Sequence, residues 1–325
     1  MDGLLKEIKI SEIENVKIGH AENFESGTGC TVIICEKGAP AGVDVRGGGP
    51  ASRETELLNP VADCKGIHAL LLSGGSAYGL DGAGGVMKYL EEKEIGFPVG
   101  KTVVPLVCAS CLFDLNVGDY KVRPDAEMAY RACEDAENLR DDSGCIGAGT
   151  GATVGKFLGP EHTMKSGLGC YAVQIGELKV GAVVAVNALG DIFDEKTGKK
   201  LAGILNEDKT GFGDTETEFY KVYSRMKNLF TGNTTIGAII TNGKFDKVQM
   251  KKIAAMAQNG YARTIRPVHT TADGDSIYGL SSGDVEADLN VTGTLASLVM
   301  ARAVNKAILS AQSMYGYLSA KDVQK

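Results

Sequence analysis

Residues 232–242 read Gly-Asn-Thr-Thr-Ile-Gly-Ala-Ile-Ile-Thr-Asn. A polar turn changes here into a short apolar run with β-branched residues, a pattern that predicts a loop feeding a buried strand. Asn and Thr are common at such turns, so a turn that opens a strand is a sufficient interpretation of these residues. A second hypothesis is that the chain cuts itself between Asn233 and Thr234. Thr234 would then be a new N-terminus, with its hydroxyl as nucleophile and its α-amino group as base.

The composition is that of an ordinary globular protein. Hydrophobic residues make up 43% and charged residues 23% of the 325 residues. The net charge of −7 gives no electrostatic support to nucleic-acid binding. No apolar run approaches the roughly 18–20 residues that span a bilayer, and the first residues have no secretory apolar segment. We therefore expect a cytoplasmic protein with neither a nucleic-acid nor a membrane partner.

The cysteines and histidines show no metal-ligand spacing. Eight cysteines are scattered through the chain, and without an export signal this favours reduced thiols. Cys108 and Cys111 are spaced as in a C-x-x-C motif, but a zinc site would need a second such pair or nearby histidines. The four histidines stand at positions 20, 68, 162 and 269. We expect no metal site and buried, unmodified thiols.

Strands are expected both in runs and between helices. Residues 30–35, 41–50, 68–72 and 276–281 have strand patterns, the second ending in a glycine turn, and residues 171–175 and 179–186 form a predicted hairpin. Helices are predicted over residues 80–92, 124–139, 246–261 and 291–314, and residues 201–230 are expected to be a polar surface segment with one helix. No repeat or linker divides the chain, so residues 1–325 are expected to form one α/β domain. This mixture favours stacked antiparallel or mixed sheets flanked by helices over a doubly wound sheet.

Several polar positions could carry chemistry. The glycine cluster at residues 147–156 fails the Walker A pattern, because Phe157 follows Lys156 and Thr150 replaces the first glycine. It also lacks the preceding strand of a dinucleotide fingerprint. A Ser-His-Asp triad stays open, although no Gly-x-Ser-x-Gly elbow is present. Asp273 and Asp275 form either a simple turn or a pair of carboxylates that raise each other's pKa or hold a cation. Asn187 ends an apolar strand, where an amide can face a cleft.

Seven short motifs are together similar to one known family. They are Val43-Asp44-Val45-Arg46-Gly47-Gly48, Gly74-Gly75-Ser76-Ala77-Tyr78-Gly79-Leu80, Gly147-Ala148-Gly149, Gly155-Lys156, Val186-Asn187, Gly232-Asn233-Thr234-Thr235-Ile236 and His269-Thr270-x-x-Asp273-Gly274-Asp275. The chain resembles the self-processing N-terminal-nucleophile hydrolases of peptidase family S58, the L-aminopeptidase/D-amino-acid esterase family. Within it the chain is most similar to the endo-type 6-aminohexanoate-oligomer hydrolases, or nylon hydrolases.

The resemblance implies an αββα sandwich that is cleaved before its nucleophile, here into residues 1–233 and 234–325. It implies homo-oligomers, dimers or tetramers, of cleaved protomers, and no metal or organic cofactor. Its site residues carry over one by one: Thr234 as the nucleophile after cleavage at Asn233, Asn187 as the oxyanion-side amide, Lys156 as a cation close to Thr234, Asp273 and Asp275 as supports of the nucleophile and its amine, and Tyr78 as a substrate-binding residue lining the cleft.

The implied activity is hydrolysis of linear amides, nylon oligomers or short peptides, through an acyl-enzyme on Thr234. In the aminopeptidase branch the nucleophile is often Ser and the supporting positions include Ser and Glu, so Thr and two Asp favour the oligomer-hydrolase branch. Three alternatives stay open: an acyltransferase similar to the ornithine acetyltransferases, an aminopeptidase with a peptide substrate, and a non-catalytic, glycine-rich ligand-binding protein.

Overall fold

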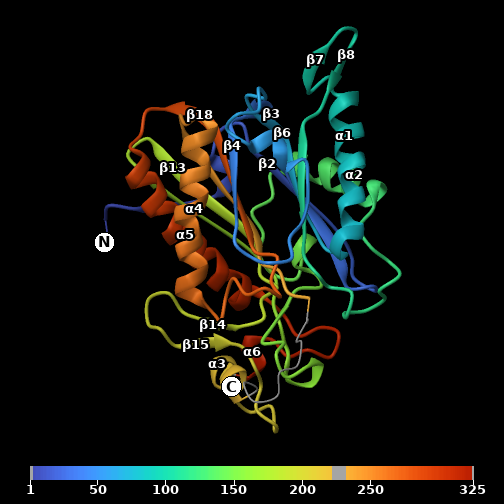
Figure 1. The fold of residues 1–325 in the computed structure, drawn as a ribbon, viewed down its shortest axis with the longest axis vertical. Helices are drawn as coiled ribbons and strands as arrows, with labels where there is room; N and C mark the ends of the chain where they lie inside the picture. Colours follow the sequence, from blue (N-terminus) through green and yellow to red (C-terminus); the bar gives the residue numbers. More distant parts are fainter. Residues whose placement is uncertain (1–2, 222–231, 324–325) are drawn as a thin grey trace.

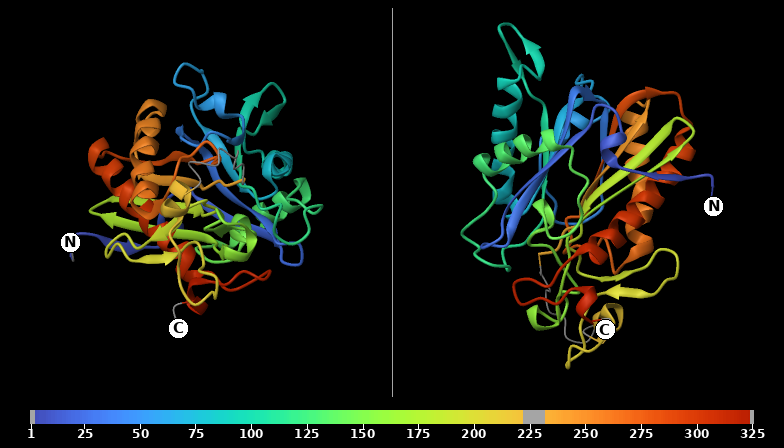
Figure 2. Two further views of the ribbon diagram at one scale, coloured as in Figure 1. Left: turned by 60° about the horizontal axis from the view of Figure 1, so that its bottom comes forward. Right: turned by 180° about the vertical axis from the view of Figure 1, so that it is seen from behind.

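Two mixed β-sheets lie face to face, and helices cover the outer face of each (Figures 1 and 2). The structure is a computed structural model that describes residues 3–221 and 232–323. One sheet has the strand order β1 (Lys6–Ile8), β12 (Leu168–Ile175), β13 (Leu178–Ala185), β16 (Ile236–Gly243), β18 (Ser276–Val285), β4 (Ala41–Val45). The other has the order β2 (Lys17–Asn23), β3 (Thr28–Ala39), β6 (Ile67–Ser73), β9 (Val107–Cys111), β5 (Ala51–Arg53).

Helices α4 (Lys247–Thr264) and α5 (Leu289–Ser310) pack on the first sheet, and α1 (Ala83–Glu92) and α2 (Ala126–Asp135) on the second. The shorter elements lie around this sandwich. They are β7 (Phe97–Val99) with β8 (Thr102–Val104), β10 (Thr153–Val154) with β11 (Met164–Lys165), the small sheet β15 (Lys200–Ala202), β14 (Asp191–Phe193), β17 (Ile265–Arg266), and the helices α3 (Thr215–Lys221) and α6 (Ala320–Val323).

Three apolar layers hold the sandwich together. On β16, Ile236, Ala238 and Ile240 join the layer between the sheets, whereas Ile239 faces the layer under α4 and α5. Successive strand residues point to opposite faces, so a strand covered on both sides must be apolar throughout. A third layer fills the space between the second sheet and helices α1 and α2. The predicted αββα sandwich is thereby confirmed.

Strand direction brings distant segments to one edge of the first sheet. Strand β13 is antiparallel to β16, so its C-terminal end lies beside the start of β16. Strand β18 is parallel to β16, so the two strands start side by side, with Ile236 opposite Ser276. As a result Asn187, Thr234 and the turn at residues 269–275 meet at this edge.

Most of the predicted elements are present, with shifted ends. The helix predicted over residues 246–261 is α4, where the Asp246 side chain caps Gln249 N–H and Gln249 reaches back to Asp246 N–H, a capping box. The predicted hairpin is the pair β12 and β13, joined at Gly176. The helix expected from residue 80 begins as a 3₁₀ turn, Ser76–Gly82, before α1.

The expectation of a surface segment over residues 201–230 was wrong at its beginning. Ala202, Ile204 and Leu205 are buried, because the short strand β15 pairs with β14 and brings this stretch against the interior. The expected helix is α3, and residues 222–231 lie outside the described part of the chain.

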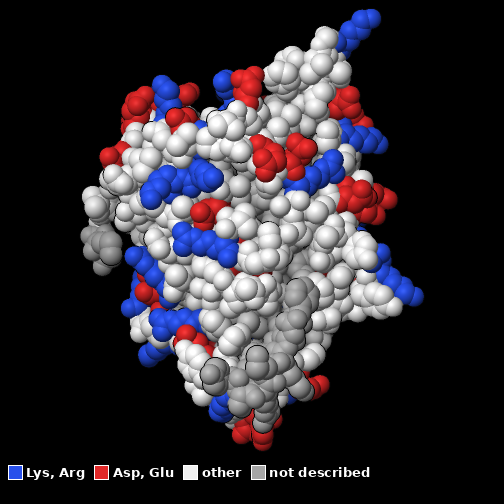
Figure 3. Space-filling view, viewed as in Figure 1, with Lys and Arg blue, Asp and Glu red and all other residues white. Residues whose placement is uncertain are grey.

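All eight cysteines carry free thiols, seven of them buried. In residues 3–221 and 232–323, no helix combines the length and the apolar character that a bilayer crossing requires. Positive and negative side chains are interspersed over the face shown in Figure 3.

Candidate active site

Thr234 sits just before β16 and is 5% exposed. Its N–H donates to the Asn187 carbonyl (3.0 Å), and its hydroxyl donates to the carbonyl of Asn233, the residue before it. The same Asn233 carbonyl accepts Gly274 N–H at 3.0 Å. A carbonyl that accepts two hydrogen bonds is polarised, and the hydroxyl lies against it. The bond between Asn233 and Thr234 is therefore held beside a potential nucleophile.

Asn187 joins this threonine to Lys156. Lys156 Nζ donates to Asn187 Oδ1 (2.5 Å) and to its backbone carbonyl (3.2 Å), the acceptor that Thr234 N–H also uses. Asn187 is fully buried, its Oδ1 also accepts Thr153 N–H, and its Nδ2 donates to the Phe113 carbonyl at 2.8 Å. The structure thus places Lys156, Asn187 and Thr234 together, as the resemblance implied.

Glycines around Lys156 serve close packing of the backbone. Gly155 has φ +69°, and a Cβ on it would lie 2.1 Å from the Gly203 backbone.

Burial lowers the pKa of Lys156 to about 7, and the charge of Lys165 adds to this effect. The carboxylates of Asp273 and Asp114 act in the opposite direction and limit the shift. Lys156 can therefore exchange a proton near neutral pH.

The two aspartates hold the neighbouring turn. Asp275 accepts Thr235 N–H (2.8 Å) and, on its other oxygen, the backbone N–H of His269 (3.1 Å) and its Nδ1 (3.0 Å). Asp273 accepts Thr270 N–H (2.8 Å) and its hydroxyl (2.6 Å). The bond from Thr235 to Asp275 fixes the backbone just after Thr234, and the other bonds hold the turn at residues 269–275.

Asp273 is also linked to Asn233 through the backbone and to Lys156 by charge. Its backbone forms a parallel β-bridge with Asn233. Burial, followed by the charge of Asp275, raises the pKa of Asp273 to about 6, and Thr270 and Lys156 oppose this rise. A carboxyl group with this pKa exchanges protons close to neutral pH.

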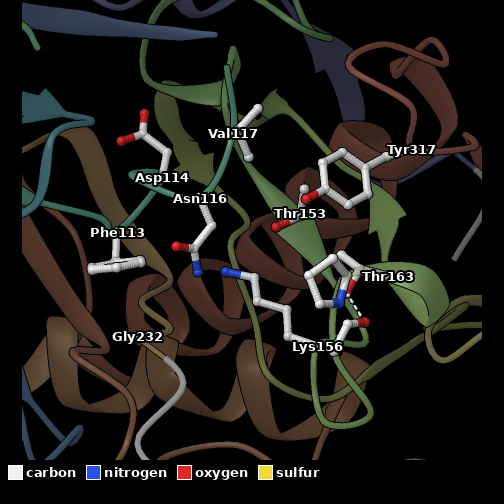
Figure 4. A pocket seen from close by; sticks show the side chains of 11 residues that line it. Phe113, Asp114, Asn116, Val117, Thr153, Lys156, Thr163, Gly232 and Tyr317 are labelled. Atoms are coloured by element: carbon white, nitrogen blue, oxygen red, sulfur yellow. Dashed lines mark hydrogen bonds between the residues drawn. The ribbon is translucent and has the colours of Figure 1, made fainter. Parts of the chain in front are cut away.

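A cavity of about 260 Å³ opens beside these groups (Figure 4). It is lined by Phe113, Asp114, Asn116, Val117, Thr153, Lys156, Gly159, Pro160, Thr163, Gly232 and Tyr317. The side-chain nitrogens of Asn116 and Lys156 point toward one another across it. Apolar walls with a few convergent polar groups are typical of small-molecule sites.

Sequence reasoning missed Phe113, Asp114 and Asn116, which follow β9. Asp114 is buried and accepts the Thr28 hydroxyl and Gly75 N–H, both at 2.7 Å. A Cβ on Gly74 would lie 2.1 Å from its carboxylate, so the glycine pair was a sequence signal for a close approach. No comparable signal marks Phe113 or Asn116.

Tyr78 lies apart from this cavity. Its side chain is among the exposed ones, at 61%, and the Arg123 guanidinium stacks over its ring at 4.1 Å. The expected role of Tyr78 in substrate binding stays a prediction.

Comparison with known proteins shows the family. The sequence model of Peptidase family S58 matches residues 9–321. The chain belongs to peptidase family S58. Peptidases cleave amides, so this S58 member is a hydrolase of C–N amide bonds.

The similar proteins include some that are named aminopeptidases and some that are named 6-aminohexanoate-oligomer endohydrolases. An uncharacterized aminopeptidase of Mycobacterium leprae is 36% identical, over 94% of this chain and 91% of that protein. A 6-aminohexanoate-oligomer endohydrolase of an Agromyces strain is 29% identical, over 91% and 84%. The solved L-aminopeptidase D-Ala-esterase/amidase of Ochrobactrum anthropi, described as a variant of the Ntn hydrolase fold, superposes with a TM-score of 0.70 at 16% identity, over 97% and 91%. The S58 chain therefore has the Ntn hydrolase fold.

Proposed function

We propose that this chain is a self-cleaving amidohydrolase that uses Thr234 as an N-terminal nucleophile. The observation that carries the proposal is the contact between the Thr234 hydroxyl and the Asn233 carbonyl, which also accepts Gly274 N–H. The nitrogen of Lys156 stands next to them on the same Asn187 carbonyl. Nucleophile, polarised carbonyl and a proton acceptor thus meet at one peptide bond.

The maturation step follows from these groups. Neutral Lys156 takes the Thr234 hydroxyl proton, and Oγ attacks the carbonyl carbon of Asn233. Gly274 N–H stabilises the oxyanion that forms. The C–N bond to Thr234 then breaks, and the departing amine takes the proton. Water opens the resulting ester and leaves the Asn233 carboxylate and a free Thr234 amine, separating residues 1–233 from 234–325.

Turnover repeats the chemistry on an external amide. A free α-amine has a pKa of about 7.7–8.0, so a large part of it is neutral near pH 7.5. It would take the Thr234 hydroxyl proton while Oγ attacks the substrate carbonyl, and the leaving amine would depart protonated. Water would then release the acid from the acyl-enzyme. The Asn187 amide has two N–H groups, and the one not bound to Phe113 is the candidate oxyanion donor.

Short linear amides are the proposed substrate class. The relatives named above include an aminopeptidase and a 6-aminohexanoate-oligomer endohydrolase, and both names denote enzymes that cleave amide bonds. An aminopeptidase is the second candidate function, because the relative with that name has the higher identity of the two. An acyltransferase would use the same Thr234 ester but pass the acyl group to an amine; transfer to added hydroxylamine at the expense of hydrolysis would support that alternative.

A set of threonine variants tests the proposal. Wild type should give two fragments on a denaturing gel, Thr234→Ala one full-length band, and Thr234→Ser the two fragments again. Thr235→Val is the matched control, because the buried Thr235 hydroxyl has no hydrogen-bond partner in the described structure, and it should still be cut. An uncut wild type, or a Thr234→Ala chain cut at the same bond, would overturn the proposal.

A further inference from the structure

Phe113 is held in place by the candidate active site, yet it has no role in the chemistry above. It lies two residues after β9, and its carbonyl accepts the buried Asn187 amide at 2.8 Å. Asn187 in turn binds Lys156 and Thr234. The position of Phe113 is therefore fixed relative to the reacting groups.

The ring of Phe113 lies against Gly232, two residues before the candidate nucleophile. A Cβ on Gly232 would lie 2.7 Å from two ring carbons and 3.0 Å from a third. Real Cβ atoms do not approach other atoms this closely, so a side chain here would have to displace the ring. Gly232 is buried and has φ +59°, a conformation that glycine adopts readily. The ring thus leaves room for backbone only.

Self-cleavage and substrate hydrolysis share one intermediate, an ester on Thr234 Oγ. In the first reaction the acyl part of this ester is the chain that ends in residues 232 and 233. In the second it is the acyl part of the substrate, attached to the same oxygen. The substrate acyl chain should therefore follow the path of Gly232 and Asn233, along the cavity that Gly232 and Phe113 line.

We propose that Phe113 determines acyl-side specificity, admitting only acyl chains that are unbranched where Gly232 lies in the uncut protein. The inference rests on the proposed function and narrows its substrate class. For a peptide, the residue before the one that supplies the scissile carbonyl must be glycine; for another linear amide, that segment must be a methylene chain. Val117, Pro160 and Tyr317 provide further apolar walls for such a chain.

The self-cleavage reaction allows a test without an external substrate. Gly232→Ala should slow cutting at the 233–234 bond about tenfold, because the new methyl group meets the ring. In the Phe113→Leu background the same change should slow cutting by no more than about threefold. Backbone strain from alanine at positive φ is present in both backgrounds and cancels in the comparison. Equal slowing in both backgrounds would overturn the inference.

Substrate selection gives a second test on the mature enzyme. Chromogenic amides of Gly-Asn and Leu-Asn should differ at least about tenfold in kcat/KM with wild type, and the ratio should collapse toward one in Phe113→Ala. Phe97→Leu, an exposed phenylalanine on the β7–β8 hairpin, is the control and should keep the wild-type ratio. An unchanged ratio in Phe113→Ala overturns the inference alone. An uncut wild type would instead overturn the proposed function, so the two failures are distinguishable.

Discussion

The protonation of Lys156 should set the pH dependence of self-cleavage. An ordinary lysine with a pKa of 10.5 would be neutral in only about one molecule in 3,000 at pH 7, whereas a pKa of about 7 makes half of the molecules neutral. Only the neutral amine can take the Thr234 proton. Between pH 6 and pH 8 its fraction rises from about one tenth to about nine tenths. The cutting rate should therefore rise about tenfold across this interval and level off above pH 8.

The assay follows freshly made chain. Labelled protein from cell-free translation is moved to buffers from pH 5.5 to pH 9, and the loss of the full-length band is timed on denaturing gels. Lys156→Arg keeps the positive charge but stays protonated throughout, so cutting should slow by a factor of about 100 or more. Lys93→Arg, at an exposed lysine, is the control and should be cut like wild type.

Two results would exclude Lys156 as the base. One is a cutting rate that is the same at pH 6 and pH 8. The other is a Lys156→Arg chain that is cut as fast as wild type. Either would show that the proton of Thr234 does not go to Lys156.

Three further substitutions probe the scaffold of the site. Asp275→Asn replaces one acceptor oxygen by an NH₂ group, which then faces either Thr235 N–H or the His269 donors. Because two donors would face each other, cutting should slow about 100-fold in the same gel assay. A wild-type cutting rate would contradict the anchoring role of Asp275. Lys165 is fully buried, its Nζ donates to the backbone carbonyls of Gly149, Ala152 and Ser166, and burial lowers its pKa to about 8. Between about pH 8 and pH 10.5, Lys165 is protonated in the unfolded chain but neutral in the folded chain. As pH rises through this window, the free energy of unfolding of wild type, measured with urea, should therefore increase by up to about 3 kcal/mol relative to that of Lys165→Met. A difference between the two proteins that stays constant with pH would contradict a lowered pKa. Asp246→Ala removes the cap of α4 and should lower the free energy of unfolding by about 1 kcal/mol, and no change in the urea midpoint would argue against the capping box.

Apolar patterning was sufficient to predict most of the sandwich. Strand β16 shows why: its centre is buried on both faces, so its residues are almost continuously apolar, and a turn precedes them. Helix α4 carries its own start signal in Asp246. Residues 202–205 were misjudged because the strand there is only three residues long, and its burial depends on the non-local partner β14.

The candidate site was accessible from sequence only through the resemblance. Lys156, Asn187 and Thr234 are separated by tens of residues, and no local pattern says that β13 runs antiparallel beside β16. Phe113 was missed for a different reason. Its importance comes from a contact with Gly232 across the fold, and a lone phenylalanine after a strand gives no hint of that contact.

We expect Thr234 itself to cut the bond between Asn233 and Thr234. Intact-mass spectrometry of the purified, denatured wild-type protein tests it most directly, with the Thr234→Ala protein measured alongside. We expect two masses for wild type, those of residues 1–233 and 234–325, with threonine as the first residue of the smaller fragment, and one full-length mass for the variant. A single full-length mass for wild type, or a cut at any other bond, would show that Thr234 does not cut this bond.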